Sequence, residues 1–170
     1  MSGCSSLRGT GDLEYIEGKG TVLQIDPGDR EDPVEVSGTT LEGDDVALAD
    51  LRDRVVVVNV WAGWCGPCRA ETPRLVEAAK QLKEAAFLGI HFRESAATGR
   101  AFERKHGVPY PSIQDEGGEA LLQFGEYAPE SPPTTFVLDR EGRVAALISG
   151  AIPSTTTLVE VVEEVAAEDG

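Results

Sequence analysis

Cysteine is scarce in this chain of 170 residues, which contains only Cys4, Cys65 and Cys68. A framework of several disulfide bonds is therefore excluded, and the fold must be stabilised by a hydrophobic core. Apolar residues make up 41% of the sequence, enough for the core of one compact domain. Long apolar runs are also missing: no stretch reaches the roughly 18 to 20 residues of a membrane-spanning helix, and no apolar signal-peptide core precedes the domain.

Basic residues are few as well, with 15 Lys and Arg against 30 Asp and Glu and a formal net charge of −15. Contacts to phosphate groups require clustered Lys and Arg, so a nucleic-acid partner is not expected. The same charge argues against simple adsorption to anionic lipid. An acidic exterior says little else about a partner, because many soluble proteins have one.

The first 20 residues are rich in Gly, Ser and charge and show no hydrophobic periodicity. They predict a flexible tail over 1–20, ahead of one domain over 21–170. Cys4 follows a small residue and precedes two serines, which resembles the mature end of a bacterial lipoprotein. Cys4 is therefore a candidate for lipid attachment, which would anchor the protein outside the cytoplasm; the alternative is a lone cysteine in a disordered tail.

Hydrophobic patterning predicts an α/β domain. We expect a short strand at 22–25, a small hairpin at 39–48, a buried central strand at 55–60 and an amphipathic helix after it. The remaining expected elements are a strand at 87–92, helices at 96–106 and 119–124, a strand pair at 134–138 and 144–149, and a closing helix near 158–165. This order predicts a mixed central sheet flanked by helices on both faces.

The most informative motif is Trp64-Cys65-Gly66-Pro67-Cys68, placed where the central strand ends and a helical pattern begins. Two sulfurs at this spacing can close a small disulfide, and the first lies over the unpaired N–H groups of a helix N-terminus. Cysteines in such positions have pKa values of about 3.5 to 7.5, against about 8.5 for a free thiol. The motif therefore predicts a redox-active dithiol with Cys65 as the nucleophile.

Three segments together resemble the thioredoxin superfamily, over roughly residues 34–167. Residues 58–73 are similar to its active-site segment, and the Cys-X-X-Cys-X-X-Glu-X-Pro form is similar to its extracytoplasmic TlpA/ResA branch, of the cytochrome c biogenesis type. Residues 107–112 resemble the central insertion of that branch, and 133–139 resemble its cis-proline strand. The resemblance implies a thioredoxin-like fold with an N-terminal β-hairpin and a central insertion.

The resemblance also implies a monomeric, extracytoplasmic thiol–disulfide oxidoreductase that needs no cofactor. Its partners would be protein thiols and disulfides, including the haem-attachment cysteines of apocytochrome c, with a membrane thiol donor as an electron source. Cys65 would attack a disulfide and Cys68 would resolve the mixed disulfide. Pro133, if cis, would place backbone beside the dithiol. The residues expected around the docking groove are Trp64, Gly66, Pro67, Pro132 and Tyr110.

One departure from the superfamily concerns proton transfer. Asn59 stands where thioredoxins have a buried Asp, and an amide cannot titrate. Glu71 follows Cys68 by three helical positions and is the candidate proton acceptor; the alternative for Glu71 is a solvated helix residue.

Other functions compete for the same cysteines. A disulfide-introducing oxidase would use the same residues, since members with similar dipeptides differ widely in potential. A Cu(I)-handling assembly factor would need a third ligand, for which His91 is the best placed, although a satisfied core histidine is the alternative. Zinc would need a second pair of ligands that the chain lacks, so no metal is expected. The Pro-X-X-X-Thr-X-X-Cys signature of thiol peroxidases is absent.

Overall fold

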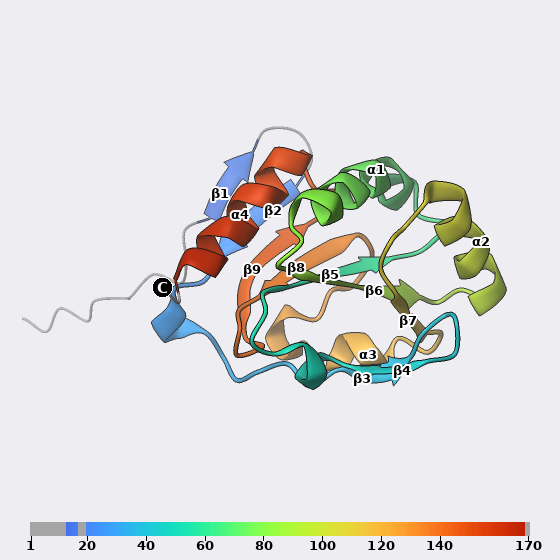
Figure 1. The fold of residues 1–170 in the computed structure, drawn as a ribbon, viewed down its shortest axis with the longest axis horizontal. Coiled ribbons are helices and arrows are strands. Elements are labelled where there is room, and N and C mark those ends of the chain that lie inside the picture. The colour runs from blue at the N-terminus through green and yellow to red at the C-terminus, as the bar shows by residue number, and fades with distance from the viewer. Residues whose placement is uncertain (1–12, 17–19, 169–170) are drawn as a thin grey trace, which may run out of the picture.

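The apolar runs of the sequence form strands of one seven-stranded mixed sheet (Figure 1). The computed structural model describes residues 13–16 and 20–168. In spatial order the strands are β1 (Leu13–Ile16), β2 (Gly20–Gln24), β9 (Val144–Ser149), β8 (Thr134–Leu138), β5 (Val56–Trp61), β6 (Ala86–Phe92) and β7 (Ser112–Asp115). The last three run parallel, and the other neighbours pair antiparallel. A separate hairpin consists of β3 (Ser37–Thr39) and β4 (Asp45–Ala47).

Helices cover both faces of the sheet (Figure 1). Helices α1 (Gly66–Gln81), α2 (Ala96–His106) and α4 (Thr155–Ala167) lie on one face, and α3 (Glu119–Leu122) and the hairpin lie on the other. Strand side chains alternate between two apolar cores: Val57 packs with α1 and α4, while Val58 packs with α3. The predicted mixed sheet with helices on both faces and an N-terminal hairpin is confirmed.

Two short strands differ from the expectation. Leu13–Ile16 form β1 within the segment predicted to be a flexible tail, and their backbone pairs with all but the last residue of β2. The sequence does not predict β7, because Ser112–Asp115 has no strong apolar pattern. The backbone of β7 pairs with the carboxyl half of β6. In both cases the ladder to a neighbouring strand provides the hydrogen bonds. The division of the chain at residue 20 stays a prediction, since residues 1–12 and 17–19 lie outside the described part.

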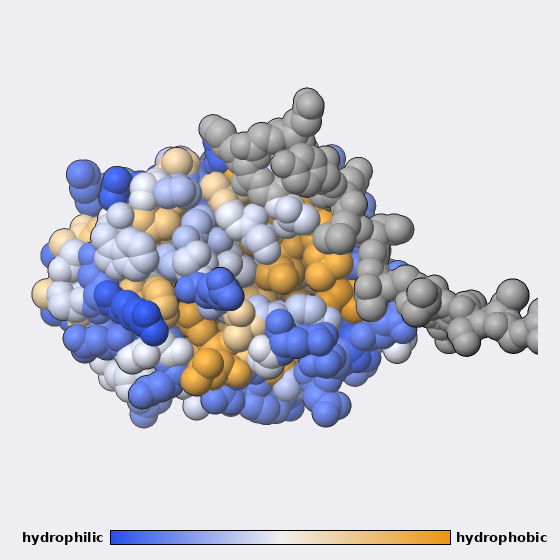
Figure 2. Space-filling view, turned by 180° about the vertical axis from the view of Figure 1, so that it is seen from behind, coloured by the Kyte–Doolittle hydropathy of each residue, from blue (hydrophilic) through white to orange (hydrophobic). Residues whose placement is uncertain are grey.

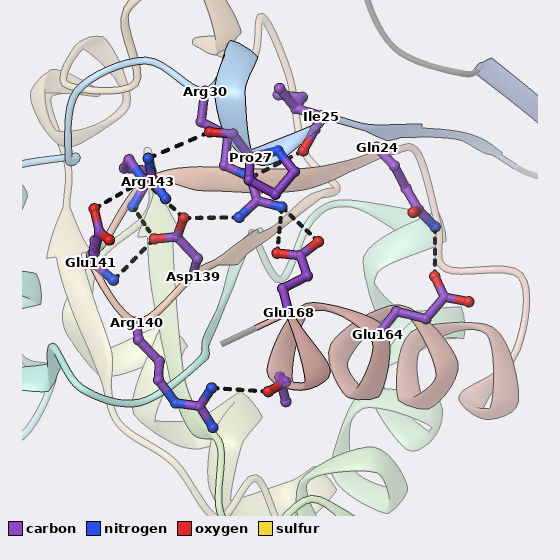
Figure 3. Close-up of polar contacts among 11 residues, drawn as sticks. Gln24, Ile25, Pro27, Arg30, Asp139, Arg140, Glu141, Arg143, Glu164 and Glu168 are labelled. Carbon is purple, nitrogen blue, oxygen red and sulfur yellow. Dashed lines mark hydrogen bonds and ion pairs between the residues drawn. The ribbon is translucent and has the colours of Figure 1, made fainter. Parts of the chain in front are cut away.

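A buried ionic cluster joins the segment after β2 to the end of α4 (Figure 3). Arg30 donates to Asp139 Oδ2 at 2.9 Å and to Glu168 Oε2 at 2.6 Å. Asp139 Oδ1 accepts the backbone N–H groups of Glu141 and Arg143, each at 3.0 Å. Burial by itself would raise the pKa of Asp139, but the N–H of Arg143 and the guanidinium groups of Arg30 and Arg143 outweigh burial and hold that pKa below its usual value.

An Arg30→Met variant should lower the free energy of unfolding by about 3 kcal/mol, because it leaves a buried carboxylate short of a partner. The side chains of Arg30 and Asp139 are only 2% and 3% exposed, so solvent cannot replace the pair. Since the pKa of Asp139 is lowered in the folded protein, this stabilisation is present at neutral pH and is lost as pH falls through the folded value. Urea unfolding at pH 7 and pH 3 measures both effects. An Arg104→Met variant, at an exposed position of α2, is the matched control; equal losses in the two variants would contradict the expectation.

The surface is mostly hydrophilic, as the net charge of −15 leads one to expect. Figure 2 shows the face opposite to that of Figure 1, where apolar surface is concentrated in a central strip between hydrophilic regions. Large apolar side chains that are exposed among the described residues are Trp64 and Leu122. Within the same part of the chain, no helix has the length and apolar character needed to cross a membrane.

Candidate active site

Cys65 and Cys68 lie where β5 passes into α1. The chain leaves β5 in a turn in which the N–H of Cys65 donates to Ala62 O at 3.3 Å, and Cys65 is the N-cap residue of α1. Pro67 lies in the first turn, where its missing N–H costs nothing. The two cysteines are joined by a disulfide, with Cα atoms 5.2 Å apart. Cys65 Sγ also accepts the N–H of Cys68 at 3.2 Å, so a helix N-terminus faces this sulfur, as the sequence predicts.

The Pro132–Pro133 segment lies beside this sulfur. The peptide bond between the two prolines is cis, and the carbonyl oxygen of Pro132 lies 3.7 Å from Cys65 Sγ. Pro133 immediately precedes β8, which is hydrogen bonded to β5, so two neighbouring strands fix the dithiol and the proline segment relative to each other. The placement beside Cys65 that the sequence suggests for Pro132 and Pro133 is thus found in the structure.

A mostly apolar hollow opens next to the dithiol. Its lining comes from the start of α1, the residue after the cis bond and the loop after β9: Gly66, Pro67, Ala70, Arg74, Pro133, Gly150 and Ala151. Trp64 precedes Cys65 and is 55% exposed, whereas Cys65 and Cys68 are 5% and 1% exposed. Of the five residues expected around the groove, Gly66 and Pro67 line this hollow, Pro132 places its carbonyl oxygen beside Cys65, and Trp64 is exposed next to Cys65 in the chain.

Tyr110 is the exception. Its ring packs against Phe87 with centroids 5.5 Å apart, and it borders a different hollow, with Leu51, Arg54 and residues 85–88. Because β7 runs parallel to β6, the residues before Ser112 lie toward the amino end of β6, whereas Cys65 follows the carboxyl end of β5. Tyr110 therefore does not line the groove beside Cys65.

Glu71 is fully buried in α1, which overturns the alternative that it is a solvated helix residue. Its Oε1 accepts Asn59 Nδ2 at 2.8 Å, and its Oε2 accepts the N–H of Ile152 at 2.9 Å. Burial raises the pKa of Glu71 to about 7, although the hydrogen bonds from Ile152 and Asn59 and the charge of Arg74 oppose the increase. A carboxyl group that changes its charge near neutral pH thus lies three residues from Cys68.

The sequence contained a signal for this burial. Cys68, Glu71, Leu75 and Ala78 recur at helical spacing and all four are buried, so Glu71 belongs to the apolar stripe of α1. Asn59 bridges the carboxyl group to β8, since its Nδ2 also lies 3.1 Å from Thr135 Oγ1. An amide can present either its N–H₂ or its oxygen after a flip, so Asn59 can partner Glu71 in both protonation states.

His91, the third ligand considered for copper, has both ring nitrogens engaged. Nδ1 lies 2.9 Å from Gln114 Oε1, and Nε2 lies 2.8 Å from Glu94 Oε2. Within residues 13–16 and 20–168, no group of three or more His, Cys, Asp or Glu side chains could hold a metal ion. His91 is thus a satisfied core histidine. Cys4, the predicted lipid site, lies outside the described residues.

Comparisons with known proteins find a redox family and thiol–disulfide oxidoreductases. Residues 27–147 match the sequence model of the AhpC/TSA family. The chain is 30% identical over 114 residues to the thiol-disulfide oxidoreductase ResA of Bacillus thuringiensis, covering 66% of this chain and 64% of that protein. It is 36% identical over 119 residues to the thiol:disulfide interchange protein DsbE homolog of Paracoccus denitrificans, covering 68% and 62%. The chain therefore spans less than two thirds of the length of these curated relatives.

Solved structures agree over a larger share of the chain. A DsbF homologue from Corynebacterium diphtheriae superposes with a TM-score of 0.79 at 34% identity, covering 92% of this chain and 99% of that one. A secreted thiol-disulfide isomerase from Corynebacterium glutamicum gives a TM-score of 0.80 at 28% identity, covering 91% and 98%. These neighbours share the mixed sheet and its helices with the present chain.

Proposed function

Because this chain belongs to the AhpC/TSA family and has a thioredoxin-like fold, we propose that it is an extracytoplasmic thiol–disulfide oxidoreductase acting through Cys65 and Cys68. The observation that carries the proposal is the disulfide at the N-terminus of α1, with the carbonyl oxygen of Pro132 beside its first sulfur. The names of ResA, DsbE and the secreted isomerase support the same chemistry and the same side of the membrane.

Exchange takes place in two steps. The Cys65 thiolate attacks a partner disulfide, so that one Cys65–partner bond forms and one partner thiolate leaves. Cys68 then gives up its proton, and its thiolate attacks the Cys65 sulfur and releases the second partner thiol. The partner disulfide is reduced and the Cys65–Cys68 dithiol is oxidised. Glu71 accepts the Cys68 proton, as a buried carboxylate with a pKa of about 7 can do at neutral pH.

The groove suits an extended segment of a protein partner. The apolar lining around Pro67, Ala70 and Pro133 would bury apolar side chains of the partner, and Trp64 adds an exposed aromatic contact. The backbone carbonyl of Pro132 offers an acceptor to a partner strand. Suitable partners are secreted proteins with accessible cysteines, including apocytochrome c, and a membrane thiol donor would restore the dithiol. Lipid attached at Cys4 would keep the monomeric protein at the membrane.

The midpoint potential of the Cys65–Cys68 pair decides the direction of exchange. We expect a value below about −220 mV, that of a reductant, because the Gly66-Pro67 dipeptide matches the reducing thioredoxins, which lie near −270 mV. Equilibration in defined thiol–disulfide buffers, followed by alkylation and mass spectrometry, measures it. A value near −120 mV would instead assign the protein as a disulfide-introducing oxidase.

A further inference from the structure

Glu94 approaches the dithiol from an element that the proposed mechanism does not use. It lies just after β6, and the residue before it, Arg93, has a left-handed backbone with φ of 48°. The Arg93 guanidinium lies over the Phe92 ring at 4.9 Å, and the backbone N–H of Arg93 donates to Asp115 O at 3.1 Å. Non-glycine residues adopt this conformation rarely, and such residues concentrate at functional sites. The turn directs the Glu94 side chain toward the loop that precedes Cys65.

The contact with that loop is direct. Glu94 Oε2 accepts the N–H of Gly63 at 2.7 Å, and Arg69 Nη1 donates to the carbonyl oxygen of Gly63 at 2.8 Å. Gly63 is thus held on both sides within the turn from Ala62 to Cys65. A Cβ atom at Gly63 would come within 3.0 Å of both carboxylate oxygens of Glu94. Glycine at this position therefore allows the carboxylate to reach the backbone.

His91 holds the carboxylate from the other side. The ring is fully buried between Trp61, at 4.5 Å between centroids, and Gly99 of α2, where a Cβ atom would lie 2.7 Å from the ring. Gln114 Nε2 donates to the backbone oxygen of Glu94 at 2.7 Å, so Gln114 Oε1 must face His91 Nδ1 and accept its proton. Nε2 then faces the carboxylate, with Glu94 Oε2 at 2.8 Å. His91 is fully buried, so the ring holds the Glu94 side chain from the side opposite to Gly63.

We propose that Glu94 is a positioning residue of the redox site: paired with His91, its carboxylate holds the Gly63 peptide and so fixes the turn that presents Cys65 to the N-terminus of α1. This inference rests on the proposed function. A fixed turn keeps Cys65 Sγ at the Cys68 N–H, the donor that stabilises a thiolate there. A more stable thiolate favours the reduced form and makes the disulfide more oxidising. Glu94 therefore raises the midpoint potential of the pair.

The contact can be broken from either end. Glu94→Ala removes the carboxylate, and Gly63→Ala places a methyl group against it, since the three nearest atoms to that methyl group all belong to Glu94. Each variant should shift the equilibrium of the dithiol with glutathione toward the disulfide by threefold to tenfold, where tenfold corresponds to about 30 mV. Because both changes break one contact, the double variant should shift no further than either single variant.

The measurement is the redox equilibrium of the whole protein, determined by alkylation and mass spectrometry, with thermal unfolding recorded for each variant. Glu116→Gln, at an exposed position after β7, is the control for charge and should leave the equilibrium unchanged. Additive shifts, or shifts below twofold in both single variants, would overturn the positioning role. In either case, continued exchange through Cys65 would leave the proposed function standing, whereas a wild-type protein that exchanges no disulfide would refute the proposed function itself.

Discussion

A Cys65→Ser variant should lose thiol–disulfide exchange by about a thousandfold or more, because it removes the only sulfur that faces both the helix N-terminus and the groove in the described part of the chain. The serine hydroxyl keeps the shape of the site but is not ionised at neutral pH. Reduction of a disulfide-bonded peptide, followed by mass spectrometry, measures the loss. Introducing Cys4→Ser into every protein of the series removes the third thiol from the assay.

A Cys68→Ser variant should behave differently. Cys65 can still attack, but no second sulfur is present to resolve the product, so a covalent mixed disulfide with the peptide should accumulate. Cys68 is 1% exposed and lies one turn into α1, which fits a sulfur that acts only after Cys65 has reacted. If the Cys65→Ser protein traps the peptide and Cys68→Ser does not, the two roles are reversed.

A Glu71→Gln variant should slow the resolving step tenfold to a hundredfold at pH 8, because it removes the proposed acceptor of the Cys68 proton. Glu71 accepts a proton only when ionised, so the wild-type rate should rise as pH increases through about 7. The variant should show a flatter profile over the same range. Rapid-mixing kinetics of mixed-disulfide resolution from pH 6 to 8.5 would record both profiles. Glu77→Gln, at an exposed position of α1, serves as the control.

The same substitution should stabilise the folded protein. Folding raises the pKa of Glu71 from 4.5 to about 7, so the folded state binds the proton more tightly than the unfolded state. Ionisation of Glu71 therefore lowers stability progressively as pH rises from about 4.5 to about 7, by about 3 kcal/mol in total. Glu71→Gln should relieve most of this cost at pH 8 and little of it at pH 4. If the variant resolves the mixed disulfide more slowly and is also more stable, the loss of rate comes from proton transfer and not from a packing defect. A less stable variant at pH 8 would contradict the expectation.

Strong local patterns made much of the fold predictable. Three elements follow from local sequence alone and are found in the structure. They are the apolar run that forms β5, the helical spacing of apolar residues in α4, and the end of α2 at Gly107. Strands β1 and β7 are short, and neighbouring strands supply their hydrogen bonds, so their own sequences say little. The position of Tyr110 likewise depends on β7 running parallel to β6, which no local pattern reveals.

The candidate site divides in the same way. Cys65, Cys68 and the proline segment could be identified because each lies in a short contiguous motif, which can be recognised from its residue types and from its resemblance to a known family. The Asn59–Glu71 hydrogen bond and the Glu94–Gly63 contact join residues 12 and 31 positions apart. Such contacts depend on how α1 and the end of β6 are placed around the sheet. A sequence pattern can indicate that a side chain is buried, but not which distant residue it contacts.

The pairing of β2 with β9 has a consequence for how the chain acquires its structure. Residues 21–24 find their partners at 146–149, more than a hundred positions later. During synthesis, which proceeds from the amino end, β2 can pair with β1, but its other edge must wait until β9 has emerged. The sheet that supports the dithiol also needs β8, which precedes β9 by one turn. Completion of the redox site and closure of the amino-terminal segment are therefore both late events, and long-range pairing of this kind makes folding slow.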